Sequence, residues 1–593
     1  MRSRLPALIL ALVATIAYAL IGHLVFAGRP LHVDEITQAF QAKIFASGQL
    51  WIPTPEPPEF FNQLLIVNRG GRTFSQFPPG WPALLGLGYL LRAPWLIAPI
   101  CGGLAVLALD QLLRAAKEPD ATRLAAIVLF AVSPWVAFNA ASWMNHAPTT
   151  LWLLAGLAAT FTASDHDPKR AWLIAAGGLA FGIAFTIRPV DALAFLVPVG
   201  IWLGLSLLRR ESSWREAAIF GAGFAGPAAA FLAFNHATTG HAFLIGYEAQ
   251  WGSAHRLGFH EAPWGPPHTV ARGWELIARY YRQLQWAMYE SPLSALSFPA
   301  LAIVLTRRFR AVDGVLLGGA ALLSLAYFAY WFEAEHLGPR YLFPLAPLVA
   351  LWTARLPGVL STRGAPRWLA GAVAVVIGVN VLAGLVVGTP ERWRQYATYA
   401  PGRRWDADSA LAEAQIKDAV ILVREPWGAQ VAARLAGRGV PRPMVERLYR
   451  STDLCVLDTA VAGLEREGLS WPDAAPALME LMRDSLRVVP MTRSPDHTSR
   501  MLIEVTYPAR CEARLLEDRR GTFSLLPLLL ASRGGNLFAR DLHELTPHLL
   551  ESQLGRPVFV LTARRDPAGH EVRAFEPFFV DSAERDWRDA SQH

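Results

Sequence analysis

Residues 5–40 read LPALILALVATIAYALIGHLVFAGRPLHVDEITQAF. The first part, from Leu5 to Ala27, is predominantly apolar and long enough to cross a bilayer. Two adjacent carboxylates, Asp34 and Glu35, follow it almost directly. Because charge is costly to desolvate near a membrane, carboxylates at the mouth of a membrane helix are candidates for a functional site.

The composition of the whole chain extends this interpretation. With 593 residues and 53% hydrophobic content, the chain is too long for one ordinary globular domain and too apolar for several soluble ones. Apolar runs dominate up to about residue 390, and charged and apolar positions alternate beyond it. We therefore predict a mainly α-helical fold, with a polytopic membrane domain over residues 1–390 and a soluble α/β domain over residues 391–593.

The membrane domain contains about eleven apolar runs that could span a bilayer. They are residues 5–27, 94–114, 122–140, 147–163, 171–187, 192–208, 216–234, 293–306, 313–332, 341–354 and 368–388. The runs 293–306 and 341–354 are the shortest. Residues 80–91 are too few to span and predict a re-entrant or interfacial segment.

Arginines and lysines cluster at alternate ends of successive spans, which predicts a cytoplasmic N-terminus and an extracytoplasmic C-terminal domain in a bacterial inner or plasma membrane. The first run could instead be a cleavable signal, but its length favours a retained anchor. The net charge of +7 follows these clusters, so it indicates topology rather than a nucleic-acid partner. Two external loops, 28–93 and 235–292, then collect most of the polar residues of the membrane domain.

In the first external loop, Ile36, Phe40 and Ile44 recur every four residues up to Gly48. This spacing predicts an amphipathic helix lying along the outer membrane interface. Asp34 would lie in its first turn, where it could also be a simple N-cap. The prolines and glycine of Phe74–Pro82 (FSQFPPGWP) predict a rigid turn back into the membrane, either structural or in contact with a ligand.

Two arginines lie at the external ends of later spans. Arg340, within Leu337–Leu342 (LGPRYL), could bind a phosphate, with Glu333 or Glu335 orienting its guanidinium. Arg188 precedes Asp191 by three positions, which suits a buried structural pair as well as a binding site.

The second external loop is rich in histidine and tryptophan, as expected for sugar stacking and phosphate contacts, although interface anchoring explains single tryptophans equally well. Its histidines are His236, His241, His255, His260 and His268. No spacing predicts a metal site, and we expect no required cofactor. The alternative is a metal-dependent relative in which Asp34, Glu35, His146 and His336 converge.

These motifs resemble those of the GT-C class of polytopic glycosyltransferases, especially the branch of protein O-mannosyltransferases and lipid A aminoarabinose transferases. The resemblance covers about residues 1–390. It rests on the following segments: Asp34-Glu35, Ser75–Pro82, Asn235–Gly240 (NHATTG), His255–Phe259 (HRLGF) and Gly338–Leu342.

The resemblance implies an inverting transfer of a sugar from a polyprenyl-phosphate carrier to a hydroxyl acceptor outside the cytoplasm, with Asp34 as the base. Asp34 and Glu35 are thus the expected catalytic pair. A phosphate leaving group needs cations rather than a general acid, and we expect these from Arg340, Arg256 and Arg188. The residues expected to contact substrate are His146, Tyr341, His255, Glu335 and Asp191.

Other functions fit the sequence less well. A transporter or flippase of lipid-linked saccharides would place its ionisable residues near the midplane and show related halves. A scaffold leaves the polar clustering at one face unexplained, whereas an oligosaccharide ligase or polymerase would use similar substrates.

In the C-terminal region, residues 419–423 and 557–561 predict strands, and residues 427–438 and 539–554 predict helices. Cys455 and Cys511 could pair if this domain is exported.

Overall fold

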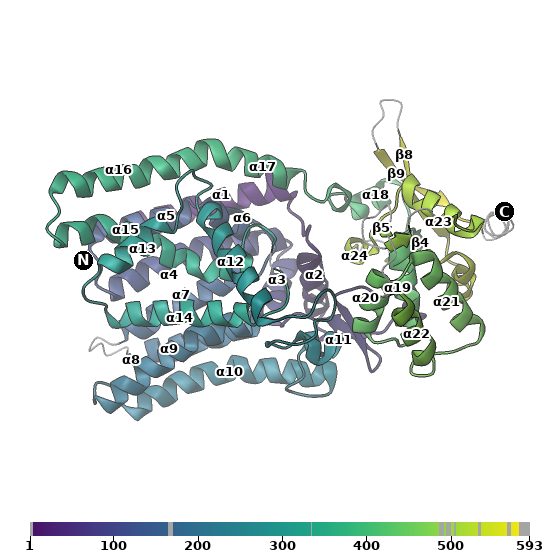
Figure 1. The fold of residues 1–593 in the computed structure, drawn as a ribbon, viewed down its shortest axis with the longest axis horizontal. Coiled ribbons are helices and arrows are strands. Elements are labelled where there is room, and N and C mark those ends of the chain that lie inside the picture. The colour runs from purple at the N-terminus through teal and green to yellow at the C-terminus, as the bar shows by residue number, and fades with distance from the viewer. Residues whose placement is uncertain are drawn as a thin grey trace.

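The computed structural model describes residues 4–163, 170–333, 335–485, 491–493, 500–502, 506–531, 535–565 and 571–579. These form a bundle of long helices and a smaller α/β domain, which lie one after the other along the long axis of the molecule (Figure 1).

The bundle begins with α1 (Leu5–Phe26). It is followed by α2 (Val33–Ala46), whose first turn contains Asp34 and Glu35. The next helices are α3 (Gly80–Leu90), α4 (Ile97–Ala115), α5 (Asp120–Ala131), α6 (Pro134–Ala141), α7 (His146–Thr162), α8 (Arg170–Ile187), α9 (Pro189–Leu208) and α10 (Trp214–Thr239). The remainder are α11 (Gly246–Trp251), α12 (Val270–Ala287), α13 (Ser297–Leu305), α14 (Ala311–Phe328), α15 (Ala346–Thr362), α16 (Arg367–Ala383) and α17 (Thr389–Ala397).

Among the described residues, eight helices are long and apolar enough to span a membrane, or nine if the bent pair α5 and α6 forms one span. The chain is therefore an integral membrane protein. The predicted number of spans was larger because two of the predicted runs form shorter helices. The run 147–163 forms α7, with 17 residues, and the run 293–306 contains α13, with only 9.

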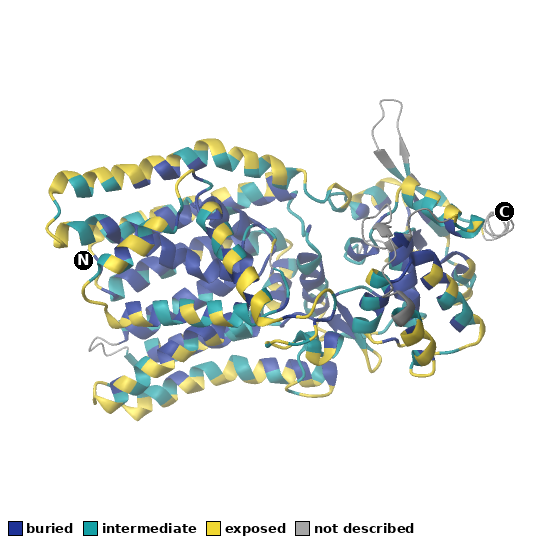
Figure 2. Ribbon diagram, in the orientation of Figure 1, coloured by how far each residue is buried: buried dark blue, intermediate teal, exposed yellow. Residues whose placement is uncertain are grey.

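Burial separates inner from outer spans. In the apolar stretch of Arg340–Thr362, 78% of the residues are buried. In those of Leu5–Phe26 and Arg367–Ala397, the share is 28% each. Exposed residues follow the flanking helices α10 and α16, and buried residues fill the middle of the bundle (Figure 2). The exposed side chains of the outer spans are largely leucine and valine, as expected for a surface that faces lipid.

The C-terminal domain is built on a four-stranded sheet of order β7-β4-β8-β9. Strand β4 (Val420–Val423) is parallel to both β7 (Leu537–Arg540) and β8 (Val558–Arg565), and β9 (Glu571–Pro577) is antiparallel to β8. β4 is buried on both faces, in keeping with its continuous apolar run. The predicted helix 539–554 is partly wrong, because its first residues belong to β7 and α25 begins only at Thr546.

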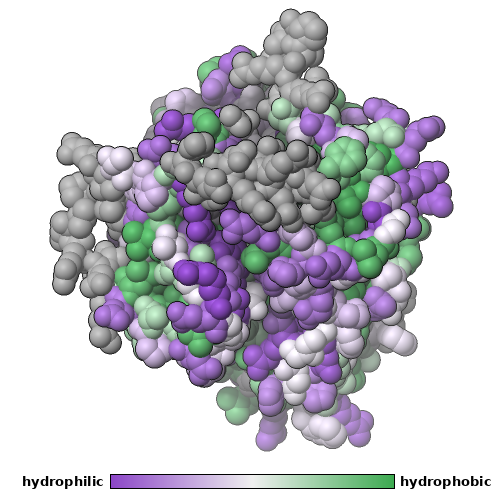
Figure 3. Space-filling model, turned by 90° about the vertical axis from the view of Figure 1, so that its right-hand side faces the viewer, coloured by the Kyte–Doolittle hydropathy of each residue, from purple (hydrophilic) through white to green (hydrophobic). Residues whose placement is uncertain are grey.

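Helices and a small strand pair complete this domain. They are α18 (Ala407–Glu413), α19 (Trp427–Gly437), α20 (Arg442–Ser451), α21 (Leu454–Arg466), α22 (Ala475–Ser485), β5 (Met491–Arg493), β6 (Arg500–Leu502), α23 (Ala509–Arg520), α24 (Leu525–Leu528) and α25 (Thr546–Glu551). Its end of the molecule shows hydrophilic side chains interspersed with apolar ones (Figure 3).

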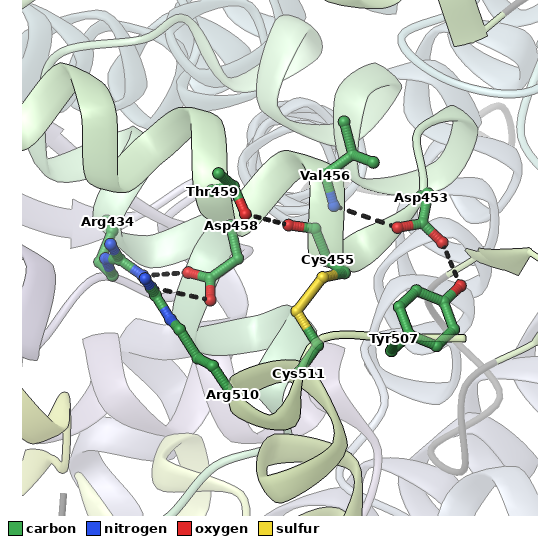
Figure 4. The surroundings of a disulfide bond; sticks show 9 residues. All are labelled: Arg434, Asp453, Cys455, Val456, Asp458, Thr459, Tyr507, Arg510 and Cys511. Carbon is green, nitrogen blue, oxygen red and sulfur yellow. Dashed lines mark hydrogen bonds and ion pairs between the residues drawn. A yellow bond between two sulfur atoms is a disulfide. The ribbon is translucent and has the colours of Figure 1, made fainter. Parts of the chain in front are cut away.

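A disulfide joins two helices of the C-terminal domain. It links Cys455 in α21 to Cys511 in α23, beside the ion pair of Arg434 and Asp458 (Figure 4). Since disulfides persist mainly in oxidising compartments, the bond is compatible with an exported domain.

The first external loop joins the two domains. It forms a small antiparallel sheet of β1 (Ile52–Pro53), β3 (Arg72–Ser75) and β2 (Ile66–Arg69). Phe60 is fully buried against residues of β4 and β8 in the core of the C-terminal domain. Arg540 donates hydrogen bonds from the sheet to the backbone oxygens of Glu59 (2.6 Å) and Asn62 (2.9 Å). These contacts attach the C-terminal domain to the loop that also contains α2 and α3.

Candidate active site

The Asp-Glu pair opens α2, and its two carboxylates have different surroundings. His32 is the N-cap, and its Nδ1 accepts a hydrogen bond from the backbone N–H of Asp34. Glu35 completes the cap: its side chain accepts from the N–H groups of Leu31 (2.8 Å), His32 (2.9 Å) and Trp143 (3.1 Å). Glu35 therefore ties α2 to its preceding turn and to the start of α7, and the alternative that Asp34 is the N-cap is wrong.

Burial sets the protonation behaviour of Glu35. It raises the pKa of the carboxyl to about 7, against the opposing effect of the three backbone N–H groups. A group so enclosed cannot meet a substrate hydroxyl directly. The structure thus gives Glu35 a structural position and leaves Asp34 as the carboxylate that can take part in chemistry.

Helix α2 does not lie on an open membrane interface as its spacing predicted. Ile36 and Ala39 are fully buried, and Ile36 packs against Ile66 and against Leu526 of the C-terminal domain. The apolar stripe contacts protein rather than lipid, because the first external loop and the C-terminal domain cover the helix. A sequence pattern alone cannot distinguish these two apolar environments.

Asp34 forms an ion pair with Arg340, 306 positions away in the sequence. The Nη1 atom of Arg340 donates to Oδ2 of Asp34 at 2.8 Å. Arg340 is almost fully buried, whereas 18% of the Asp34 side chain is exposed. Among the described residues, the buried Nε of Arg340 has no hydrogen-bond partner. The pair is a carboxylate with access to solvent and a cation whose donors are incompletely used.

A tight turn brings Arg340 to this position. Gly338 has a φ of +89°, and a Cβ there would lie 2.7 Å from Nε1 of Trp135. Only glycine satisfies both requirements, since other residues rarely adopt this φ and would collide with the tryptophan. The predicted orientation of Arg340 by Glu333 or Glu335 is wrong, because these carboxylates pair with Arg272 (2.6 Å) and Arg279 (3.3 Å), respectively.

Arg188 lies near Arg340 but is held by different partners. Its Nε donates to Asp191 at 2.6 Å, its Nη1 contacts Asn145 and His146 at 3.2 Å each, and its Nη2 donates to the hydroxyl of Tyr327 at 2.6 Å. The Tyr327 hydroxyl donates in turn to Asp191, which is fully buried. Arg188 is consequently both a structural pair with Asp191 and a source of positive charge at the site.

Tyr341 connects the two arginines. Arg188 and Arg340 lie 5.5 and 5.6 Å from its ring centroid, and Tyr327 stacks on it at 4.4 Å. Such cation–aromatic contacts favour a fixed position for both guanidinium groups. Asp34, Arg340, Tyr341, Arg188, Asp191 and His146 therefore form one contiguous cluster, drawn from α2, α7, α9 and the segment preceding α15.

A cavity of about 360 Å³ adjoins this cluster. It is lined by Arg188, Tyr341 and Tyr327, and also by Tyr247 and Tyr330. Its volume lies within the range of small-molecule sites. Burial raises the pKa of Tyr247, and the charge of Asp34 raises it further. Of the cluster, Arg188 and Tyr341 line the cavity, whereas Asp34 and Arg340 are not among its lining residues.

The second external loop supplies the far side of the cavity. His255 stacks on Tyr247 with 4.6 Å between ring centroids and contacts the Tyr330 hydroxyl at 3.2 Å. Burial lowers the pKa of His255 to about 4, so the imidazole is neutral at neutral pH. Arg256 lines the rim, where 62% of its side chain is exposed and it pairs with Glu248 at 2.9 Å.

The turn at Phe74–Pro82 also contributes to the site. Pro78 lines the cavity, and Phe77 packs edge-on against Tyr247 with ring centroids 5.5 Å apart. The side-chain oxygen of Gln76 accepts a hydrogen bond from Nε1 of Trp251 at 2.8 Å. The turn therefore makes structural contacts, and it also lies next to a space large enough for a ligand.

Some predicted residues lie outside this cluster. Glu335 faces a separate cavity of about 460 Å³, which it shares with His336. His336 stacks on His32 with 4.1 Å between ring centroids. Within the described ranges, no group of three or more His, Cys, Asp or Glu side chains is placed to hold a metal ion.

Of the tyrosines of the cavity wall, only Tyr341 was predicted from the sequence, and Tyr247, Tyr327 and Tyr330 were not. Tyr327 and Tyr330 belong to the run YFAYWF at residues 327–332, at the end of α14. A run of six aromatic or small residues at the end of a span resembles an interface belt. The feature that could have distinguished this run from an interface belt is the spacing of the two tyrosines, which are three positions apart and so share one side of the chain.

No family model and no curated protein matches the chain. Solved structures of two membrane proteins show a distant likeness. ArnT from Cupriavidus metallidurans bound to undecaprenyl phosphate is 15% identical over 94% of this chain and 92% of its own, with a TM-score of 0.45. The archaeal oligosaccharyltransferase AglB from Archaeoglobus fulgidus, in complex with an inhibitory peptide and a dolichol-phosphate, is 11% identical over 84% of this chain and 75% of its own, with a TM-score of 0.42. At this degree of likeness, no residue of those proteins assigns a role to a residue of this chain.

Proposed function

We propose that this protein is an inverting membrane glycosyltransferase that moves a sugar from a polyprenyl-phosphate carrier to a hydroxyl acceptor on the extracytoplasmic side. The observation that carries the proposal is the Asp34–Arg340 ion pair beside the tyrosine-lined cavity. We assign Asp34 as the base and Arg340 as the cation that binds the phosphate. One hydrogen bond joins them, and Arg188 and Tyr341 of the same cluster line a space large enough for a sugar.

In the proposed reaction, Asp34 takes the proton of the acceptor hydroxyl. The acceptor oxygen forms a bond to the anomeric carbon, the bond from that carbon to the phosphate oxygen breaks, and the electron pair leaves with the polyprenyl phosphate. One carboxylate suffices, because the leaving phosphate needs no proton. Attack opposite the leaving group inverts the anomeric centre.

Arg340 has two functions in this scheme. Before the donor binds, it keeps Asp34 in a fixed orientation. A donor phosphate offers a stronger acceptor geometry to the guanidinium than the lone contact with Asp34, so phosphate binding would weaken that contact and increase the basicity of Asp34. Arg188 contributes positive charge from the other side of Tyr341, although most of its hydrogen bonds are already made.

The proposed orientation has support from two features. The disulfide between Cys455 and Cys511 favours an oxidising compartment for the C-terminal domain. The opposite end of the bundle holds Arg310 and Arg363, as expected for cytoplasmic ends. The sugar and the acceptor remain to be identified by assay.

The test is transfer by the full-length protein reconstituted in liposomes with radiolabelled polyprenyl-phosphate sugars and a panel of hydroxyl acceptors. We expect transfer by the wild type and by Asp418→Asn, which changes an exposed carboxylate of the C-terminal domain. Asp34→Asn should still bind the donor but lose most turnover. Transfer that chelator abolishes would contradict the metal-free scheme, and movement of the lipid-linked sugar across the bilayer without transfer would favour a flippase.

A further inference from the structure

A second cavity, of about 600 Å³, lies between the helical bundle and the C-terminal domain. Its walls come from the end of α1, from α2 and α3, and from residues 402–409 and 523–531 of the C-terminal side. It is separate from the site of Asp34. Lys43, which lines it, is nine positions after Asp34 on α2, or about two and a half turns, so the two side chains leave opposite faces of the helix.

The lining of this cavity carries excess positive charge. Its cations are Arg29, Lys43, Arg92, Arg403 and Arg573. Only two carboxylates, Asp406 and Asp408, oppose these five cations within the described lining, and Asp406 is paired with Arg29. Such a surplus attracts an anion.

Two of the cations form no ion pair among the described residues. Lys43 donates to the backbone oxygen of Leu530 and lies 5.9 Å from the ring centroid of Tyr89; burial lowers its pKa, and the charge of Asp408 acts in the opposite direction. It forms no ion pair with any residue that the structure describes. Arg92 is exposed at the rim, and its guanidinium likewise has no hydrogen bond or ion pair within the described ranges. These two groups are available to an anionic ligand.

Exposed apolar residues adjoin two lining residues in the sequence. Leu24 of α1 is 61% exposed and follows the lining residue His23, and Leu91 is 74% exposed and precedes the lining residue Arg92. The space is thus cationic, and exposed apolar residues are sequence neighbours of its lining. A phosphodiester with hydrocarbon chains matches both parts.

We infer that this cavity binds the phosphate headgroup of an anionic membrane phospholipid, whose acyl chains lie along Leu24 and Leu91. The headgroup contacts Lys43 and Arg92 from the bundle and lies against Arg573 of the C-terminal domain. The bound lipid therefore fastens the C-terminal domain over the bundle. This site is independent of the proposed sugar transfer, since it lies on the other face of α2.

Native mass spectrometry of the full-length protein, released from nanodiscs of phosphatidylcholine and phosphatidylglycerol, tests the inference. We expect the wild type to retain phosphatidylglycerol in preference to phosphatidylcholine. Lys43→Met and Arg92→Gln should each reduce that retention about five-fold, as expected for the loss of one cation near a membrane surface. Lys417→Met removes an exposed lysine of the C-terminal domain and should leave retention unchanged.

Equal retention of both lipids, or unchanged retention in the two cavity variants, would overturn the inference. If Lys43→Met fails to fold, Arg92→Gln decides the result, because that side chain is exposed at the rim. A final experiment measures the unfolding temperature of the protein in phosphatidylcholine nanodiscs with added glycerol phosphate and in nanodiscs that contain phosphatidylglycerol. If glycerol phosphate raises the unfolding temperature as much as phosphatidylglycerol does, the site recognises a free phosphate and the lipid assignment is wrong.

Discussion

Two clusters of buried charge lie at opposite ends of the bundle, and only one of them adjoins the tyrosine-lined cavity. Helix α14 reaches both: Asp313 lies in its first turn and Tyr327 in its last. The fourteen positions between them correspond to about 21 Å along the helix. The Asp313 end is the proposed cytoplasmic end, and the Tyr327 end contains Arg188 and Arg340.

The two clusters differ in how completely their charges are paired. At the Asp313 end, Arg355 donates to Asp313 at 2.7 Å and to Glu118 at 2.6 Å, and Arg310 donates to Glu118 at 2.7 Å. At the other end, Asp34 has one cation and is partly exposed, and Arg188 and Tyr341 of the same cluster line a ligand-sized space. Charge at membrane depth is therefore not sufficient to indicate a site; what distinguishes one is incomplete pairing next to a cavity.

The strongest test of this difference compares transfer activity in two matched variants. Asp34→Asn should reduce turnover by about 10²- to 10⁴-fold, the usual contribution of a positioned base. Asp313→Asn, which removes the same charge at the other cluster, should leave the turnover of the folded protein unchanged. Rates normalised to folded protein in liposomes provide the measurement, and equal losses in both variants would mean that Asp34 acts only through stability.

Stability should show the reverse order. Asp313→Asn leaves the buried guanidinium of Arg355 with one carboxylate fewer, and breaking a buried pair in this way costs about 3–5 kcal/mol. Asp34→Asn should cost less, because 18% of the Asp34 side chain is exposed to solvent whereas only 3% of the Asp313 side chain is. Unfolding in detergent micelles measures both. A larger loss of unfolding free energy in Asp34→Asn than in Asp313→Asn would contradict this prediction.

The sequence predicted this arrangement only in part. The apolar runs and the position of Asp34 after the first span are local patterns, and they predicted the apolar helix α1 and the start of α2. The covering of α2 was not predictable, because Leu526 approaches Ile36 from almost five hundred positions away. Apolar spacing indicates that a face is buried and does not indicate what buries it.

The partners of the charged residues were equally difficult to predict. Arg340 was expected to pair with a neighbouring glutamate, and it pairs with Asp34 instead. Glu333 and Glu335 are closer in sequence, but the φ of Gly338 turns the chain between them and Arg340. Long-range ion pairs depend on such turns, which no spacing rule represents.

Adjacent carboxylates with different roles provide the third test. The pKa of Glu35 is raised from 4.5 to about 7 in the folded protein, so the folded state retains a proton that the unfolded state loses between these pH values. Glu35 therefore contributes stability that is present in full below pH 4.5 and is lost as pH rises to about 7. The loss amounts to about 3 kcal/mol.

Unfolding measured from pH 4.5 to 8 in wild type and Glu35→Gln checks this slope. We expect the slope to flatten in Glu35→Gln, although its absolute stability also falls because glutamine has one acceptor oxygen for three N–H groups. An unchanged slope would mean that another group titrates in this range.

The smallest expected effect concerns Tyr327, which links α14 to the site. Tyr327→Phe removes the hydroxyl that accepts from Arg188 and donates to Asp191. Loss of such a bond costs about 1 kcal/mol, and if Arg188 helps to hold the donor phosphate, KM for the donor should rise about five-fold with kcat nearly unchanged.

The matched control is Tyr281→Phe, whose hydroxyl contacts Ser324 of the same helix α14 at 2.7 Å and does not line the cavity. Both variants should lose stability, because Tyr281→Phe breaks one hydrogen bond of α14 and Tyr327→Phe breaks two, but only Tyr327→Phe should change KM. If both variants change KM equally, the tyrosine acts through the position of α14, and the contrast between its two ends is one of packing rather than of binding.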